Sequence, residues 1–453
     1  MAVHNPADGE LLTCVPSFGT RETREAIDAA AKALPAWSRL TAVERSKPLQ
    51  RLFELVLTNE RELAAILTAE QGKPLSEAAD EIRYAASFIQ WFAEEAKRAY
   101  GEVVPAPSSD RRIIVLRQPV GVVAAITPWN FPAAMVTRKL APALAAGCTM
   151  VLKPAEQTPL TALALGALAM EAGIPAGVFN IVTGKASEIG VELTSNPIVR
   201  KLTFTGSTGV GAKLYEQCAP TIKKLSLELG GNAPFIVFDD ADIDEAVEGA
   251  IASKFRNAGQ TCVCTNRFYV QAGVHDDFLT AFSNKVSNLK IGRGDDPTVQ
   301  IGPVIDDRAA LKIDELVADA VIKGARRITE AAERRGRFIE PIILSNVSSG
   351  MKLLEEEIFG PVASVVRFET EEEVIRLANE SPFGLAAYVY CNDMRRIWRV
   401  CEALEVGMVG VNTGRISNAV SPFGGVKSSG LGREGSRHGL DDYLELKTVT
   451  MAA

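Results

Sequence analysis

Short runs of consecutive apolar residues alternate with longer amphipathic stretches from Gly121 onward. Apolar runs without polar alternation are typical of strands buried on both faces, and a helix between two such strands indicates a parallel sheet. The pattern restarts at Pro234, which predicts two parallel sheets in series. The expected strands are 122–126, 150–152, 179–182, 202–204, 235–238, 268–271, 362–368, 386–390 and 408–411, and the clearest helices are 135–146, 160–172 and 243–255.

The first hundred residues have a helical pattern instead. Thr41 and Asn59 are each followed by a glutamate three positions on, which predicts a capping box at two helix starts. Gly72 is expected to end the second helix, and residues 76–100 carry a helical apolar stripe. Outside this pattern, 101–121 and 443–449 have the composition of strands. We therefore predict an α/β fold with two Rossmann-like parallel-sheet domains and a small β arm.

Composition narrows the classes of function. The chain has 453 residues, of which 47% are hydrophobic and 23% charged, a globular balance that excludes disorder as the main state. The formal net charge of −7 disfavours nucleic acid as a partner, because an acidic surface repels phosphates. The apolar run 140–152 is too short to cross about 30 Å of hydrocarbon, and the first thirty residues lack a signal-peptide core. Seven scattered cysteines favour a reducing cytoplasm.

Histidine-based and metal-based chemistry find little support. The three histidines, His4, His275 and His438, have no obvious triad partners in the sequence, and we expect all three at the surface. No cysteine or histidine cluster has zinc-ligand spacing. The acidic segment 240–251 lacks the glycine and the final glutamate of a calcium loop. We therefore expect no metal.

The strongest local motif is Asn257-Ala258-Gly259-Gln260-Thr261-Cys262-Val263-Cys264, which lies between a predicted helix and the next strand. A thiolate in such a loop is exposed and supported by backbone, as a nucleophile requires. The alternative is a pair of buried, unreactive cysteines. The polar setting favours a reactive Cys262, and Cys264 is a possible partner for a reversible disulfide with it.

Without a nearby histidine, a general base would be a carboxylate, a lysine or a tyrosine. Glu228 ends an apolar predicted strand and is followed by Leu229-Gly230-Gly231. Burial would raise its pKa toward working pH. An outward-facing glutamate is the alternative at this position.

Two further segments follow strands at positions where parallel sheets bind cofactors. Phe204-Thr205-Gly206-Ser207 leads into a predicted helix whose first amides can hold a pyrophosphate, although the ordered dinucleotide fingerprint is absent. Lys153 and Glu156 place a cation and an acid just after another strand.

Taken together, these motifs resemble the aldehyde dehydrogenase superfamily over nearly the whole chain. The similarity rests on Pro128-Trp129-Asn130-Phe131-Pro132, the Lys153, Gly206 and Cys262 segments, and Glu357-Ile358-Phe359-Gly360-Pro361. It also includes the spacing of 262 − 228 = 34 residues between Glu228 and Cys262.

The resemblance implies a mechanism. Cys262 would attack the aldehyde, the Asn130 amide would hold the oxyanion, and Glu228 would activate the water that releases the acid from a thioester. For the cofactor, it implies contacts from Trp129, Lys153, Glu156, Gly206, Ser207, Glu357 and Phe359. Because a carboxylate repels a 2′-phosphate, Glu156 favours NAD over NADP, although Lys153 leaves NADP possible.

Within the superfamily, the chain is most similar to succinate-semialdehyde dehydrogenases. Matching segments imply that Arg138, Arg256 and Ser417 bind the substrate carboxylate; structural ion pairs are the alternative for both arginines. Arg415 stands where that subgroup usually carries an aliphatic residue. This departure keeps 2-oxoglutarate semialdehyde and glutarate semialdehyde open as substrates, and it leaves open that Arg415 faces solvent.

The resemblance also implies a domain plan. Residues 1–100 and 122–229 would bind NAD, 230–436 would form the catalytic domain, and 101–121 with 437–453 would form an oligomerisation arm of a homodimer or homotetramer. Three other classes compete. A cysteine thioesterase would need no nicotinamide, a CoA-acylating dehydrogenase generally lacks the base at Glu228, and a non-enzymatic scaffold would not need Cys262.

Overall fold

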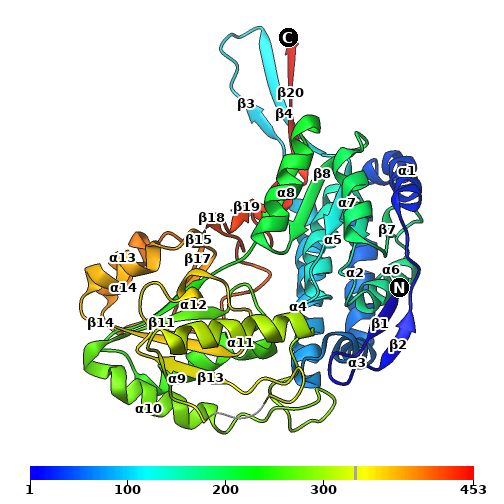
Figure 1. Ribbon diagram of the computed structural model, residues 1–453. Coiled ribbons are helices and arrows are strands. Elements are labelled where there is room, and N and C mark those ends of the chain that lie inside the picture. Colours follow the sequence, from blue (N-terminus) through cyan, green and yellow to red (C-terminus); the bar gives the residue numbers. More distant parts are fainter. Residues whose placement is uncertain (331–333, 453) are drawn as a thin grey trace.

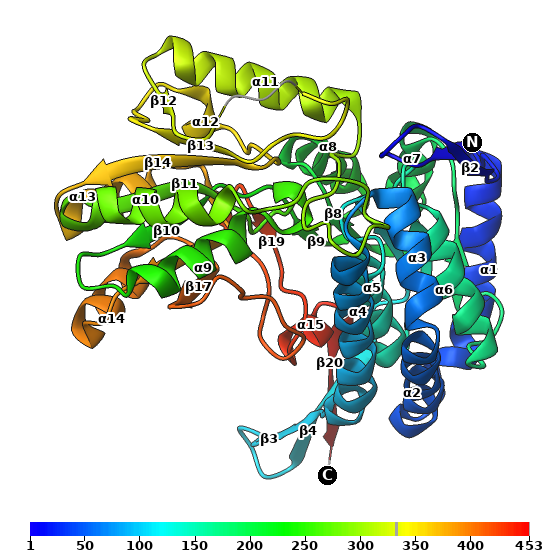
Figure 2. The same ribbon diagram turned by 90° about the horizontal axis from the view of Figure 1, so that it is seen from below.

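The computed structural model describes residues 1–330 and 334–452. It consists of two α/β bodies that lie next to each other, and a narrow arm that projects from one of them (Figure 1). The same division is visible in the perpendicular view (Figure 2).

The first body is built on a six-stranded sheet, which is parallel except for its edge strand β19. Its strands, in spatial order, are β19 (Gly430–Leu431), β9 (Lys224–Glu228), β8 (Val199–Thr205), β5 (Val122–Ile126), β6 (Thr149–Lys153) and β7 (Phe179–Ile181).

Helices cover both faces of this sheet, which explains the apolar runs without alternation. Val123 and Ala125 of β5 belong to one core, and Val122 and Ala124 belong to the other. The first core is closed by α2 (Ala42–Thr58), α3 (Glu60–Gln71), α4 (Leu75–Glu95), α5 (Ala134–Ala146) and α6 (Leu160–Glu171). The second is closed by α1 (Thr20–Ser38), α7 (Ala186–Ser195) and α8 (Thr208–Cys218).

The second body is built on a seven-stranded sheet that is parallel apart from its edge strand β12. Its order is β12 (Arg326–Arg327), β13 (Ile342–Ser345), β14 (Val362–Phe368), β11 (Thr265–Gln271), β10 (Ala233–Val237), β16 (Ala386–Tyr390) and β17 (Met408–Val411). Three clusters pack on it, carried by α9 (Ile243–Lys254) with α10 (His275–Val286), α11 (Asp307–Ile322) with α12 (Lys352–Glu355), and α13 (Glu371–Asn379) with α14 (Met394–Ala403).

The projecting arm is a three-stranded antiparallel sheet. The long strands β4 (Arg111–Pro119) and β20 (Leu444–Ala452) pair along their whole length, and β3 (Glu102–Val104) adds to β4. Thus 101–121 and the last strand lie side by side, and Leu116 pairs with Lys447, 331 residues later in the chain (Figure 1). Short pairs elsewhere are β1 (Ala2–His4) with β2 (Leu11–Cys14), and β15 (Phe383–Gly384) with β18 (Val426–Lys427).

The predicted fold class is confirmed, and four predicted strands, 122–126, 362–368, 386–390 and 408–411, have the observed bounds. Two local predictions differ. Thr41 caps α2 as expected, but Asn59 does not cap α3, because its side-chain amide donates to Leu55 O at 2.8 Å instead. The domain boundary also differs at β19, which lies in the segment assigned to the catalytic domain but pairs with Glu228 in the first sheet.

In the part of the chain that the structure describes, none of the helices combines the length and the apolar character that a membrane span needs.

Candidate active site

Cys262 lies in a loop between α9 and β11. Upstream of it, Asn257, Ala258 and Gly259 have φ values of +52°, +54° and +75°. Left-handed backbone costs a non-glycine residue of the order of 1 kcal/mol, so it persists only where the surroundings enforce it. Here Asn257 accepts from Gln71 Nε2 at 2.9 Å and donates to the Asn130 carbonyl at 3.0 Å. These bonds fix the path of the chain into Cys262.

Gly259 lets two motifs that are distant in the sequence pack against each other. A Cβ atom at this position would collide with the carbonyl oxygen of Gly360. The Gly-Gln-Thr-Cys loop therefore packs directly on the segment that contains Glu357 and Phe359, and the second of these residues is itself left-handed, with φ +55°.

The Cys262 thiol is half-buried and faces a cavity. Burial, and then the charge of Glu357, raise the pKa of Cys262 to about 12, although Arg138 and Arg256 oppose the shift. Since the thiolate is the nucleophile, a thiol with this pKa has to lose its proton to a neighbouring base as it attacks.

Asn130 reaches the same cavity from the loop after β5. Its side-chain amide donates to Gln260 O at 3.0 Å, and a second N–H of that amide remains for another acceptor. The backbone carbonyl of Asn130 accepts from Lys73 Nζ at 2.8 Å, and this lysine pairs with Glu81 at 2.5 Å. Asn130 is thus held in place through both its side-chain amide and its backbone carbonyl.

Glu228 ends β9 and is only 2% exposed. Among the described residues, neither of its carboxylate oxygens has a hydrogen-bond partner. Burial and the neighbouring charge of Glu434 raise the pKa of Glu228 well above its ordinary value, while Arg138 and Lys139 oppose the rise. A buried carboxyl whose pKa is raised in this way is suited to accept and return a proton.

Glu434 had no signal in the sequence, since its partners lie about 300 residues away. It forms ion pairs with Arg138, at 2.8 Å, and with Lys139, and all three side chains are buried. Its charge is thereby fixed beside Glu228.

The cavity at Cys262 has a volume of about 290 Å3 and lies beyond the carboxyl ends of β8 and β9. It brings together many of the residues predicted to bind the cofactor. Those that line it are Trp129, Gly206, Ser207, Glu357 and Phe359, together with Asn130 and Cys262.

The residues that line this cavity offer an apolar aromatic wall and a set of polar groups. The rings of Trp129 and Phe359 meet edge to face, with centroids 5.5 Å apart, and make an apolar wall. Ser207 precedes α8, lines the cavity and makes no side-chain capping bond of its own. Glu357 accepts from Gly231 N at 3.2 Å, and burial raises its pKa to about 7. A nicotinamide dinucleotide could use the wall for its ring, the helix start for its pyrophosphate and Glu357 for a ribose.

Lys153 and Glu156 do not line this cavity but stand at the end of β6, which pairs with β5. Glu156 Oε1 lies 3.7 Å from Lys153 Nζ and accepts from Ala186 N, at the start of α7, at 2.9 Å. Burial lowers the pKa of Lys153, and the charge of Glu156 opposes this. The acid is thus fixed next to the cation.

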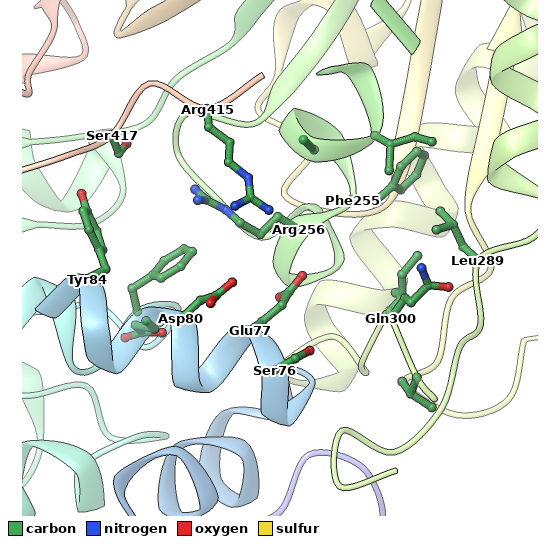
Figure 3. Close-up of a pocket in the computed structure, with 16 residues that line it drawn as sticks. Ser76, Glu77, Asp80, Tyr84, Phe255, Arg256, Leu289, Gln300, Arg415 and Ser417 are labelled. Atoms are coloured by element: carbon green, nitrogen blue, oxygen red, sulfur yellow. The ribbon is translucent and has the colours of Figure 1, made fainter. Parts of the chain in front are cut away.

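A second cavity, of about 480 Å3, lies against α4 and contains Arg256, Arg415 and Ser417 (Figure 3). Phe131 lines both cavities, so they are neighbours at this residue. The guanidinium carbon of Arg256 lies 5.3 Å from the centre of the Phe131 ring. A molecule bound here could therefore reach from Arg256 toward Cys262.

Arg138 is not brought into this cavity. It is 1% exposed, forms the ion pair with Glu434, and stacks on the Phe423 ring at 3.9 Å. Its Nε lies 2.8 Å from Glu434 Oε2, and its Nη2 has no hydrogen-bond partner among the described residues, so a contact between Arg138 and a substrate stays a prediction. Tyr84, in contrast, lines the cavity beside Ser417, and nothing in its local sequence distinguished it from a core residue of α4.

Cys264 is buried, and its thiol donates to Lys254 O at 3.3 Å. All seven cysteines are free, so a disulfide with Cys262 stays a prediction. None of the three histidines lines either cavity. The expectation of surface histidines is wrong for His275, which is 8% exposed and bonded to Asp276. Across 1–330 and 334–452, no three His, Cys, Asp or Glu side chains come together as a metal site.

The chain belongs to the aldehyde dehydrogenase family, whose model matches residues 1–449. It is therefore an NAD(P)-dependent oxidoreductase that acts on an aldehyde.

Individual relatives are close over nearly their whole length. The chain is 62% identical to the NADP(+) succinate-semialdehyde dehydrogenase of Escherichia coli K12, covering 98% of this chain and 93% of that protein. It is 61% identical to a glutarate-semialdehyde dehydrogenase of Pseudomonas putida, over 99% and 94%. A crystal structure of an E. coli NADP-dependent enzyme superposes with a TM-score of 0.99 at 61% identity, covering 100% of this chain and 94% of that one.

Proposed function

We propose that the protein oxidises succinate semialdehyde, or a closely similar carboxylated aldehyde, to the corresponding acid through a thioester on Cys262. The observation that carries this proposal is the junction of two cavities at Phe131: one contains the thiol and the other contains Arg256. The substrates named for the two relatives, succinate semialdehyde and glutarate semialdehyde, both carry a carboxylate at the end opposite the aldehyde.

In the first step Cys262 Sγ forms a bond to the aldehyde carbon. The thiol proton leaves as the bond forms, and the buried carboxylate of Glu228 would accept it. The aldehyde oxygen becomes an oxyanion, which the free N–H of the Asn130 amide and the Cys262 backbone N–H would stabilise. NAD(P)+, when bound, accepts the hydride from that carbon.

The second half of the reaction releases the acid. After the proton taken from the thiol has passed to solvent, Glu228 takes a proton from water, and the hydroxide adds to the thioester carbon. The C–S bond then breaks, and Glu228 gives this proton to the leaving sulfur, which restores the Cys262 thiol. Glu228 is suited to this step because its raised pKa lets it hold a proton at one stage and give it up at the next. The residues proposed to hold the cofactor are Trp129, Lys153, Glu156, Gly206, Ser207, Glu357 and Phe359.

Substrate choice is assigned to Arg256 and Ser417. The Arg256 guanidinium would pair with the substrate carboxylate, while Phe131 fixes the depth of the aldehyde. NAD is the preferred cofactor in this proposal, because the negative charge of Glu156 stands next to Lys153 and would repel a 2′-phosphate. We also propose a cytoplasmic homodimer or homotetramer assembled through the β4–β20 arm.

The test is NAD(P)H formation from succinate semialdehyde and from butanal, which has the same length but no carboxylate. Cys262→Ala should abolish turnover of both. Arg256→Ala should lower kcat/KM for the semialdehyde by about 10- to 100-fold, as expected for a lost charge-assisted bond, and leave butanal almost unchanged. Equal losses for both aldehydes would contradict the carboxylate assignment. Ester or thioester hydrolysis that needs Cys262 but no nicotinamide would support a thioesterase instead.

A further inference from the structure

Arg415 is the charged group in the second cavity that the proposed function does not use. It lies after β17 in an exposed segment, and its side chain extends into the cavity toward Arg256 (Figure 3). Two guanidinium groups thus face one space, although the carboxylate of succinate semialdehyde needs only one bidentate partner.

The acidic side chains that line the cavity already form ion pairs or hydrogen bonds with other groups. Glu81 pairs with Lys73 and Asp80 pairs with Arg83, each at 2.5 Å, and Glu77 accepts from Asn257 N at 2.8 Å. Burial raises the pKa of Glu77, while the charges of Lys73 and Arg256 oppose the rise.

The two arginines, in contrast, have no such partners. Among the residues that the structure describes, neither Arg256 nor Arg415 forms an ion pair within 4.0 Å, and the ion pairs of the cavity acids Glu81 and Asp80 go to other cations. Two like charges that face one solvent-accessible space repel each other unless an anion lies between them. The hydroxyls of Tyr84 and Ser417 on the same wall add neutral hydrogen-bonding groups.

We propose that Arg256 and Arg415 together select a carboxylated aldehyde that carries an additional acceptor oxygen beside its carboxylate, as in a 2-oxo acid semialdehyde. In such a molecule the carboxylate and the adjacent oxygen point the same way and present one acceptor to each guanidinium. Arg256, beside Phe131, would keep the carboxylate, and Arg415, which enters the same cavity from an exposed segment, would take the adjacent oxygen. This inference rests on the proposed function, because it assumes that the aldehyde reaches Cys262.

The test compares four aldehydes on the full-length enzyme: 2-oxoglutarate semialdehyde, glutarate semialdehyde as the length-matched acid without the extra oxygen, succinate semialdehyde and butanal. Arg415→Leu should lower kcat/KM for the 2-oxo substrate by about 10- to 100-fold, mainly through KM. The two simple acids should lose less than about 3-fold, and butanal should not change. Arg395→Leu, an exposed arginine of α14 outside the cavity, is the matched control and should behave as the parent enzyme.

Three outcomes would overturn the proposal. An equal loss for glutarate semialdehyde would mean that Arg415 responds to chain length. An equal loss for succinate semialdehyde would make it a general carboxylate ligand, and no loss for any substrate would place it in solvent. Failure of the proposed function has a different signature, since the parent enzyme would then prefer butanal to every carboxylated aldehyde.

Discussion

Gly231 and Cys262 are in direct contact: a Cβ atom on Gly231 would collide with the carbonyl oxygen of Cys262. Gly231 follows Glu228 by three residues, so the glycine that permits this approach belongs to the same motif as the proposed base. The distance between base and nucleophile therefore depends on a position without a side chain. The glycine is needed for close packing rather than for a left-handed backbone, because its φ is not positive.

Gly231→Ala should displace the Cys262 loop and lower kcat by about 100-fold, the size of effect expected when a reacting group moves by about 1 Å. The measurement is kcat for succinate semialdehyde, together with the thermal midpoint. Gly190→Ala in α7 is the control, since a Cβ there meets no atom within 4 Å. A Gly231→Ala enzyme with normal kcat would show that the loop tolerates the shift.

The pKa of Glu228 has a consequence for stability. Burial and Glu434 raise this pKa. The folded state therefore retains a proton that the unfolded chain loses near the ordinary glutamate pKa of about 4.3. Above that pH the wild-type protein loses stability until the raised pKa is passed.

Glu228→Gln keeps the neutral form at every pH. Its unfolding midpoint should therefore exceed that of the parent protein by an amount that grows with pH above about 4.3 and vanishes below it. Denaturant unfolding at several pH values measures the difference. A difference that stays constant with pH would mean that Glu228 is ionised in the fold. The same variant lacks the base proposed for both half-reactions, so neither a burst of NAD(P)H nor steady turnover is expected.

Glu434→Gln should shift the acid limb of the kcat profile to lower pH. The substitution removes a negative charge that raises the pKa of Glu228, and it frees Arg138 and Lys139, which lower that pKa. Since a base works only when deprotonated, activity should persist to a more acidic pH than in the parent enzyme. A loss of activity at all pH values without a shift would point to a purely structural role for Glu434.

The two sheets were predictable because burial on both faces leaves a local record, as in Val122–Ile126 with its four fully buried residues. Cys262 and Glu228 could also be proposed from the sequence, because each stands where the chain leaves regular structure. The pairing of Arg138 with Glu434 was not predictable, because the two residues are separated by 296 positions and a buried ion pair leaves no periodic signal. The capping box predicted at Asn59 did not form, because the Asn59 side-chain amide donates to the backbone carbonyl of Leu55, one turn earlier in the chain.

The proposed preference for NAD depends on Glu156, whose carboxylate stands 3.7 Å from Lys153 Nζ and accepts from Ala186 N at the start of α7. Glu156→Gln removes the charge but retains an oxygen for the Ala186 amide, so the helix start should stay in place. Without the carboxylate, Lys153 becomes available to a 2′-phosphate, and the repulsion of that phosphate disappears. The ratio of kcat/KM for NADP to that for NAD should therefore rise by about tenfold or more, with little change in the KM for the aldehyde. Glu188→Gln, an exposed acid in the first turn of α7, serves as the control and should leave the ratio unchanged. If Glu156→Gln leaves it unchanged as well, this carboxylate does not face the adenosine ribose, and the preference for NAD loses its basis.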